Sequence, residues 1–250
     1  MKPFIVISGL FRSGTTLLQE MLTEKDTSFI FHEPRFGDGW WQFEHIDRSY
    51  LRKWEWDPPK FDAIADTWKW FMEDKGIQIG AKEIRNAGVS FYYDCWQGNM
   101  RFVISHRDPA DIYISAYKMF TVPRGHFTWR PMFAPFSPMG IYRELMPEVK
   151  HLNNMWHMLH PLCRKVVHYN DICDRKFKDF YTFCESDMTG YGDIGGYHAV
   201  MERGVYENER HGGKITAKSV REIDTFDNPK VVADAKKFRD MIIGKMDWLK

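Results

Sequence analysis

The sequence has few cysteines, no long apolar run and almost no net charge, and each of these absences excludes a class of protein. The four cysteines, Cys95, Cys163, Cys173 and Cys184, form no C-x-x-C pair, so we expect reduced thiols in a reducing compartment rather than a disulfide framework. A formal net charge of +1 gives no broad basic field that would attract nucleic acid or an acidic membrane. No stretch resembles a signal peptide or a membrane span. If the sequence is full length, we therefore expect a cytoplasmic protein without nucleic-acid or membrane partners.

The hydrophobic content indicates one sizeable core. Hydrophobic residues make up 44% of the 250 residues, which favours a single domain over 1–250. Short apolar runs alternate with longer helical patterns. This alternation predicts an α/β fold like that of P-loop NTPases, a three-layer sandwich in which helices flank a central parallel sheet. The expected strands are 4–8, 28–32, 78–82, 101–106 and 165–169, and the expected helices are 14–23, about 62–74, 89–97, 109–117, 172–183 and 234–250.

Two aromatic-rich segments interrupt the alternation, at about 36–60 and about 120–138. Both contain prolines, and both predict long irregular insertions. Ligands of open parallel sheets bind beyond the carboxyl ends of the strands. We expect the two insertions to form a lid over an acceptor site at that edge.

Residues 7–18, ISGLFRSGTTLL, join the first expected strand to the first expected helix. Gly9 permits a sharp turn, Gly14 lets backbone N–H groups approach a ligand, and the helix N-terminus that follows favours an anion. The spacing of these glycines matches a Walker A loop, but Thr15 stands where Walker A has lysine. The cation is instead Arg12, inside the loop. We predict a site for a 5′-phosphate or a group attached to it; the alternative is a glycine-rich turn that binds nothing.

The fourth expected strand ends in His106 and Arg107, whereas the strand of a magnesium-nucleotide site would end in aspartate. The turn at Asp108 and Pro109 would place Arg107 at a helix N-terminus and Ser115 about two turns inside that helix. A guanidinium and a hydroxyl suit a second phosphate. Two phosphate sites at neighbouring strand ends indicate a nucleotide that is phosphorylated at both ends.

Residues 12–16, RSGTT, and residues 107–115, RDPADIYIS, resemble the two nucleotide motifs of the sulfotransferases that use 3′-phosphoadenosine 5′-phosphosulfate (PAPS). The first motif typically reads P-[RK]-S-G-T-T, and Phe11 replaces its proline. The second reads R-[DN]-P-x-D-x-x-x-S and is matched at every fixed position. The resemblance implies that adenosine 3′,5′-bisphosphate (PAP) is the product, that Arg107 and Ser115 bind the 3′-phosphate, and that the 5′-phosphosulfate is bound by Arg12, Ser13, Gly14, Thr15 and Thr16.

Weaker similarities extend the match along the chain. Residues 165–172, KVVHYNDI, resemble the family's strand ending in Y-E-D-[LM], which implies that Tyr169 lies near the adenine, although Asn170 departs from the usual glutamate. Residues 211–219, HGGKITAKS, resemble the late loop that closes over the nucleotide. That similarity implies a phosphate contact for Lys214.

Sulfuryl transfer to a hydroxyl requires a base and a cation beside the leaving phosphate. Glu33 follows the second expected strand and resembles the glutamate base of the bacterial-type, tyrosylprotein and carbohydrate branches. Lys82 resembles the lysine that contacts the bridging oxygen. The steroid and phenol branch uses a histidine in a K-x-H motif, and Ile84 stands at that position here. The resemblance therefore favours Glu33 as the base, with Lys82 and Arg12 as the cations.

Two alternatives to this base remain open. His32 and His106 also end strands and are candidate bases, although strand alternation points His32 and Glu33 to opposite faces. Glu33 has a purely structural alternative as well, in which it pairs with Arg35 or Lys82 and fixes the loops.

The resemblance implies transfer of the sulfuryl group of PAPS to a hydroxyl of a carbohydrate, a small-molecule alcohol or phenol, or a tyrosyl acceptor. No metal is expected: His157, His160 and Cys163 are three apart, but Pro161 interrupts their helix and a fourth ligand is lacking. The alternative functions are a P-loop nucleotide kinase or NTPase and a catalytically silent protein that binds PAPS or PAP. No motif predicts an oligomeric state.

Overall fold

The computed structural model describes residues 2–22, 27–32, 70–83, 92–93, 99–121, 136–174, 176, 178–186 and 221–250. Its strands form one parallel sheet in the order β2-β3-β1-β4-β5. Every residue of the central strand β1 is buried, as expected for a strand that is covered on both faces. All five expected strands are confirmed to within one residue at either end. Their bounds are β1 (Phe4–Gly9), β2 (Ser28–His32), β3 (Gln78–Glu83), β4 (Met100–His106) and β5 (Arg164–His168).

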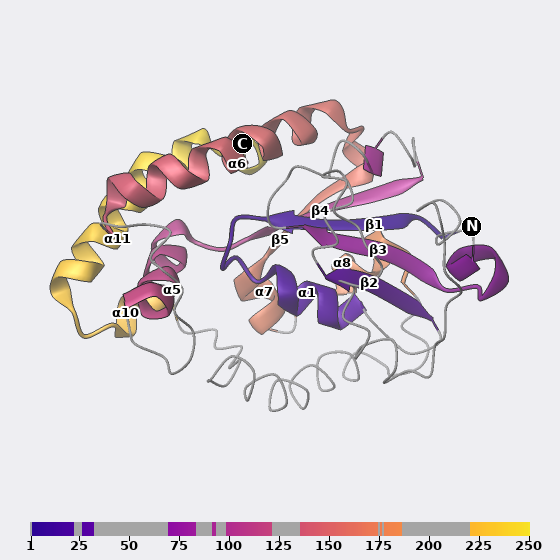
Figure 1. The fold of residues 1–250 in the computed structure, drawn as a ribbon, viewed down its shortest axis with the longest axis horizontal. Helices are drawn as coiled ribbons and strands as arrows, with labels where there is room; N and C mark the ends of the chain where they lie inside the picture. Colours follow the sequence, from indigo (N-terminus) through magenta and orange to yellow (C-terminus); the bar gives the residue numbers. More distant parts are fainter. Residues whose placement is uncertain are drawn as a thin grey trace.

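Helices cover both faces of this sheet (Figure 1). One face carries α6, with α11 packed against α6 and α5, and α1, α7 and α8 lie on the other face. No helix in the described ranges has the length and apolar character that crossing a bilayer requires. The helices are α1 (Thr15–Leu22), α5 (Pro109–Thr121), α6 (Pro138–Met158), α7 (Tyr169–Cys173), α8 (Lys178–Cys184), α10 (Glu222–Thr225) and α11 (Pro229–Ile242). The short turns are the π-helical η2 (Trp70–Asp74) and the 3-10 turns η4 (Pro161–Cys163), η6 (Ile243–Lys245) and η7 (Asp247–Leu249).

The alternation of side chains along β1 divides the core in two. Phe4 and Val6 belong to a cluster shared with α5, α6 and α11. Ile5 and Ile7 belong to a second cluster shared with α1, α7 and α8. Successive side chains of a strand point to opposite faces, so these two clusters are the layers above and below the sheet. The expected three-layer α/β fold is confirmed.

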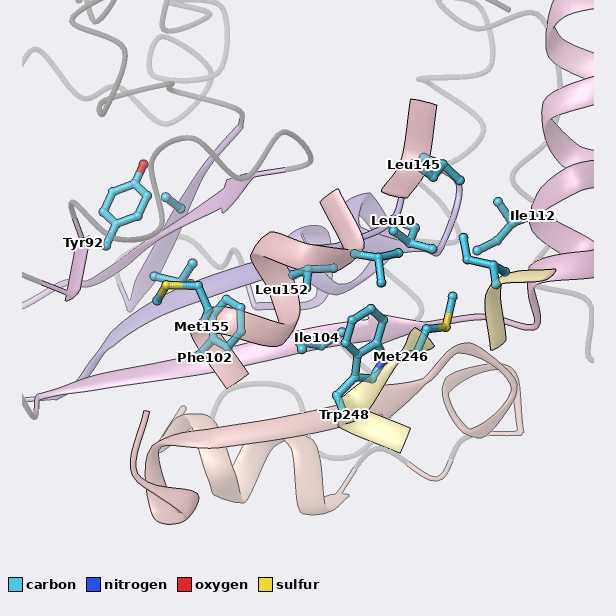
Figure 2. Packing of buried hydrophobic residues seen from close by; sticks show 14 of the residues in the cluster. Leu10, Tyr92, Phe102, Ile104, Ile112, Leu145, Leu152, Met155, Met246 and Trp248 are labelled. Carbon is cyan, nitrogen blue, oxygen red and sulfur yellow. The ribbon is translucent and has the colours of Figure 1, made fainter. Parts of the chain in front are cut away.

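The end of the chain closes the larger cluster (Figure 2). Met246 and Trp248 are buried beside Ile104 of β4, in the same cluster as Leu152 and Met155 of α6. The expected closing helix over 234–250 is therefore α11 followed by two 3-10 turns.

Helix α6 was not expected from the sequence. Its apolar residues recur at helical spacing and are buried: Ile141, Leu145, Val149, Leu152 and Met155. Ser137 caps its first turn by accepting a hydrogen bond from the N–H of Gly140 at 3.1 Å. Pro147 lies within the helix on its exposed side, and a proline there obscures a helical pattern that its neighbours otherwise carry.

The helix expected over 172–183 was wrong in its bounds. Tyr169 starts α7 instead of ending β5, and α7 ends at Cys173, so that a separate helix, α8, begins at Lys178. The start of α7 determines where the Tyr169 ring lies relative to the phosphate loop. The expected insertions, apart from the ends of the second, lie outside the described residues.

Candidate functional site

The loop after β1 forms a tight turn that places arginine where glycine is usual. The N–H of Ser13 donates to the carbonyl of Leu10 at 3.1 Å, and Arg12 occupies the third position of this turn with φ +64°. Turns of type II need a positive φ at that position, which favours glycine or asparagine. A left-handed arginine costs about 1–2 kcal/mol. Such local strain is characteristic of functional loops.

Close neighbours leave no space for a side chain at either glycine of the loop. A Cβ on Gly14, which has φ +97°, would lie 2.5 Å from Cδ2 of Tyr169. A Cβ on Gly9 would lie 2.6 Å from the carbonyl oxygen of Ser105 and from Oγ of Ser13. Ser105, which belongs to no predicted motif, also fixes the loop: its Oγ donates to the carbonyl of Ser13 at 2.8 Å. The loop is therefore held against the carboxyl end of β4.

Ser13 supplies a buried hydroxyl at the start of α1. Its Oγ is buried without a hydrogen-bond partner among the described residues, and the residue is 1% exposed. A buried polar group without a partner is costly and calls for a ligand or an ordered water. Helix α1 begins two residues later at Thr15, so its N-terminal N–H groups face the same region. This combination fits an oxyanion.

The start of α5 brings Arg107 and Ser115 to the loop. Asp108 caps the helix by accepting from the N–H of Ala110 at 2.8 Å, and Pro109 is the first helical residue, a favoured arrangement at helix N-termini. Arg107 therefore lies at the junction of β4 and α5, and Ser115 is buried within the helix.

Arg12 joins the two predicted phosphate positions. Its Nε donates to Oγ of Ser115 at 3.1 Å, and its carbonyl oxygen accepts from Nη1 of Arg107 at 3.3 Å. The sequence placed Arg12 with the 5′-phosphosulfate and placed Arg107 and Ser115 with the 3′-phosphate. In the structure Arg12 contacts both Ser115 and Arg107, so the two motifs lie side by side.

Tyr169 packs between the loop and Arg107. Its ring lies 4.7 Å from Cζ of Arg107, a cation–π contact, and against Gly14 on the loop. Burial raises the pKa of the Tyr169 phenol above its usual range, with a further contribution from Cys173. The phenol is therefore neutral at physiological pH and is a hydrogen-bonding and stacking group rather than a charged one.

Lys82 lies near the carboxyl end of β3 and is fully buried. Alternation along β3 places it on the same face as Gly80, where an added Cβ would meet Ile30 of the α1 cluster. Lys82 is thus on the face that α1 covers. Glu83 points to the opposite face, where the hydroxyl of Tyr92 donates to its Oε1 at 2.8 Å.

Several solved structures have a fold similar to that of this chain. The chain is similar to the sulfotransferase domain of the olefin synthase of Synechococcus PCC 7002, with a TM-score of 0.58 and 13% identity over 96% of this chain and 94% of that one. This chain has the sulfotransferase fold. A sulfotransferase from Alicyclobacillus acidocaldarius matches with a TM-score of 0.54 and 13% identity over 100% and 96% of the two chains. A mouse sulfotransferase complexed with PAP matches with a TM-score of 0.56 and 11% identity over 99% and 85%.

Sequence comparison does not extend this result. No family model matches the chain, and no curated protein is similar to it in sequence. At 11–13% identity the similarity to solved sulfotransferases concerns the fold alone. The roles of individual residues depend on the local geometry described above.

In this sulfotransferase fold the structure describes two of the three candidate bases, His32 and His106. Glu33 and Lys214 lie outside the described residues, and His32 is the last residue of β2. His106 ends β4, and its ring lies 5.2 Å from that of His168. Burial and the nearby His168 lower the pKa of His106 to about 4, so its imidazole is neutral at physiological pH and a weak proton acceptor.

A set of charged residues around α10 was not predicted from the sequence. Glu222 forms ion pairs with Arg107 and Lys118. Nothing in the local sequence pattern links a residue near the C-terminus to an arginine at the end of β4, because that contact exists only through the tertiary fold. Within the described ranges no group of three histidine, cysteine, aspartate or glutamate side chains could hold a metal ion.

Proposed function

We propose that this protein is a sulfotransferase that takes PAPS as donor and releases PAP. The observation that supports this most directly is the convergence of Arg12, Arg107 and Ser115 beside a glycine-rich loop. The fold supports the same conclusion, since it is shared with solved sulfotransferases, one of them complexed with PAP. A P-loop kinase is opposed by Thr15 in place of lysine and by a fourth strand that ends in His106 instead of aspartate.

The residues of the site divide into two groups by the phosphate that they would hold. The buried hydroxyl of Ser13, the amides around Gly14, and Thr15 and Thr16 at the start of α1 suit the 5′-phosphosulfate. Arg107 and Ser115 suit the 3′-phosphate, because a guanidinium and a neighbouring hydroxyl donate to the oxygens of one anion. Arg12 contributes charge between the two positions.

PAPS supplies the sulfuryl group that is transferred to the acceptor. In this proposal Glu33 removes the proton from the acceptor hydroxyl, and Lys82 supplies positive charge at the sulfuryl end of the nucleotide. Tyr169, stacked on Arg107, lies next to the adenosine, and Lys214 contacts a phosphate from the late loop. A glutamate base favours a carbohydrate, a tyrosyl residue or a small-molecule alcohol or phenol as the acceptor.

Calorimetric titration of the full chain with PAP, adenosine 5′-phosphate (AMP) and Mg-ATP tests the nucleotide. We expect PAP to bind at least about tenfold more tightly than AMP, because a charge-assisted phosphate contact contributes about 1.5–3 kcal/mol. Tight binding of Mg-ATP without any preference for a 3′-phosphate would overturn the proposal. Transfer of ³⁵S from labelled PAPS to a panel of sugars, phenols and tyrosyl peptides then separates an enzyme from a silent PAP-binding protein.

A further inference from the structure

Helix α10 is docked onto the start of α5 by a compact set of polar contacts. Nη2 of Arg221 lies 2.7 Å from Oδ2 of Asp108, and the N–H of Ile223 donates to Oδ1 of Asp111 at 2.9 Å. Between these two contacts Glu222 reaches Arg107. The segment 221–223 is therefore fixed against the helix that begins beside the proposed 3′-phosphate position.

Glu222 lies between two cations, and each of its carboxylate oxygens takes one of them. Oε1 accepts from Nη2 of Arg107 at 2.8 Å, and Oε2 lies 3.0 Å from Nζ of Lys118. Two positive side chains and one negative side chain leave a net charge of +1 on the group. Lys118 offsets the charge of the Glu222 carboxylate within this group of three, and the neighbouring Asp108 and Asp111 pair with Arg221.

The contact with Glu222 uses only part of the Arg107 guanidinium. Nη2 donates to a single carboxylate oxygen, and Nη1 donates to the carbonyl of Arg12. A guanidinium has more N–H donors than these two contacts use, so the remaining donors can serve a phosphate while both contacts persist. The Tyr169 ring covers one face of the same guanidinium. Arg107 is thus held by three groups and has further N–H donors that can bind a phosphate.

The side chains of Arg107 and Glu222 are mostly shielded from solvent, which strengthens the ion pair between them. The side chain of Arg107 is 12% exposed and that of Glu222 is 24% exposed, so solvent screens their pairing less than it screens a pair on the open surface. An unrestrained arginine loses side-chain rotamer entropy when a ligand fixes it. A side chain that is already fixed before the ligand arrives loses less of this entropy on binding.

We propose that Glu222 is a positioning residue that orients Arg107 for the nucleotide's 3′-phosphate and so determines the preference for 3′-phosphorylated nucleotides. This inference rests on the proposed function, which places that phosphate at Arg107 and Ser115. The opposite arrangement, in which Glu222 competes with the phosphate for Arg107, predicts an effect of opposite sign, and the same experiment distinguishes the two.

The experiment compares PAP and AMP binding by calorimetry in the wild type, in Glu222→Gln and in a matched control. Glu222→Gln keeps the shape of the side chain and removes its charge. The matched control is Glu185→Gln, which removes an ion pair with Arg101 at the opposite end of β4. We expect Glu222→Gln to lower PAP affinity about tenfold and to leave AMP affinity within about twofold. Glu185→Gln should leave both affinities at their wild-type values.

The outcomes separate this inference from the proposed function. A wild type that binds PAP and AMP equally well contradicts the proposed function and, with it, the inference. A wild type that prefers PAP while Glu222→Gln keeps the full preference contradicts the inference alone, as does a variant that binds PAP more tightly. Equal weakening of PAP and AMP would show a merely structural role and would also overturn it.

A second variant covers the case in which Glu222→Gln does not fold. Lys118→Gln leaves the Glu222–Arg107 contact intact and removes the balancing cation, so the group of three falls from a net charge of +1 to zero. We expect PAP affinity to fall by roughly threefold while AMP affinity is unchanged, because only the 3′-phosphate meets this charge. An unchanged ratio of the two affinities would contradict the inference.

Discussion

Nε of Arg12 donates to Oγ of Ser115 across a sequence separation of 103 residues. One partner belongs to the loop after β1 and the other to α5, which follows β4. Since β1 and β4 are adjacent and parallel, their carboxyl ends lie at the same edge of the sheet. The hydrogen bond between Arg12 and Ser115 therefore connects the two motifs that the sequence assigned to opposite ends of one nucleotide.

The Arg12–Ser115 contact should be measurable as a coupling energy. We expect Arg12→Ala and Ser115→Ala each to weaken PAP binding, and the double variant to weaken it less than the sum of the two. A coupling of about 1 kcal/mol is expected for a partly buried hydrogen bond from a charged donor. Calorimetric dissociation constants for PAP in the wild type and the three variants complete the cycle.

Additivity at an unrelated position is the control for this cycle. Glu185 pairs with Arg101 at the far end of β4, so Glu185→Gln combined with Arg12→Ala should give strictly additive changes. If Arg12 and Ser115 proved equally additive, the hydrogen bond between them would be irrelevant to nucleotide binding.

The parallel sheet was predictable because its strands carry their own signal. Each is a short segment with apolar residues at its centre, between segments of turn and polar residues, and every residue of β1 is buried. Helix α6 was missed although its apolar spacing is regular, because Pro147 lies inside it and interrupts the local pattern. The start of α7 at Tyr169 was also missed. The Tyr169 ring packs against Gly14 and Arg107, which belong to distant segments of the chain, so its position depends on tertiary structure.

The sequence can propose residues for the candidate site within one contiguous motif, but it cannot reveal contacts that join distant segments. Ser13, Gly14 and Thr15 fall within a single loop, and their spacing alone indicates an anion site. Ser105 and Glu222 contribute hydrogen bonds to this region, but neither lies in a motif. Their role follows only from the packing of β4 against β1 and of α10 against α5.

Gly14→Ala should destabilise the protein by more than the conformational cost of its backbone. The left-handed φ costs alanine about 1 kcal/mol relative to glycine, and the new Cβ would lie 2.5 Å from the Tyr169 ring, which adds about 1–3 kcal/mol of overpacking. Gly76→Ala is the matched control, because Gly76 also has a positive φ, +66°, and an added Cβ there meets nothing within 4 Å. Urea unfolding curves provide both free energies of unfolding.

The same comparison in a Tyr169→Ala background isolates the steric part. Without the ring, Gly14→Ala should cost no more than Gly76→Ala. A penalty that stayed unchanged in this background would show that the Tyr169 ring is not what excludes a side chain at Gly14.

His106 should make the protein less stable in mild acid. Burial and the neighbouring His168 lower its pKa from 6.5 to about 4 in the folded state, so protonation favours the unfolded chain. The stability associated with the neutral imidazole is complete above about pH 6.5 and is lost as the pH falls toward 4, by about 2–3 kcal/mol. Urea unfolding at pH 7.5 and pH 4.5 should therefore show a smaller loss of stability in His106→Gln than in the wild type. The exposed His160 provides the control, and His160→Gln should lose as much stability as the wild type.

Two substitutions of Arg12 should separate the strain of its backbone from the contribution of its guanidinium to nucleotide binding. Its φ of +64° is unfavourable for alanine but not for glycine, so Arg12→Gly should be more stable than Arg12→Ala by about 1 kcal/mol in urea unfolding. Both variants lack the guanidinium that donates to Ser115, and both should bind PAP about tenfold more weakly than the wild type. Because the two variants differ only in backbone preference, equal stabilities would show that the turn is not strained. If PAP binding were unchanged in both, the strained backbone of Arg12 would have no connection with a phosphate site.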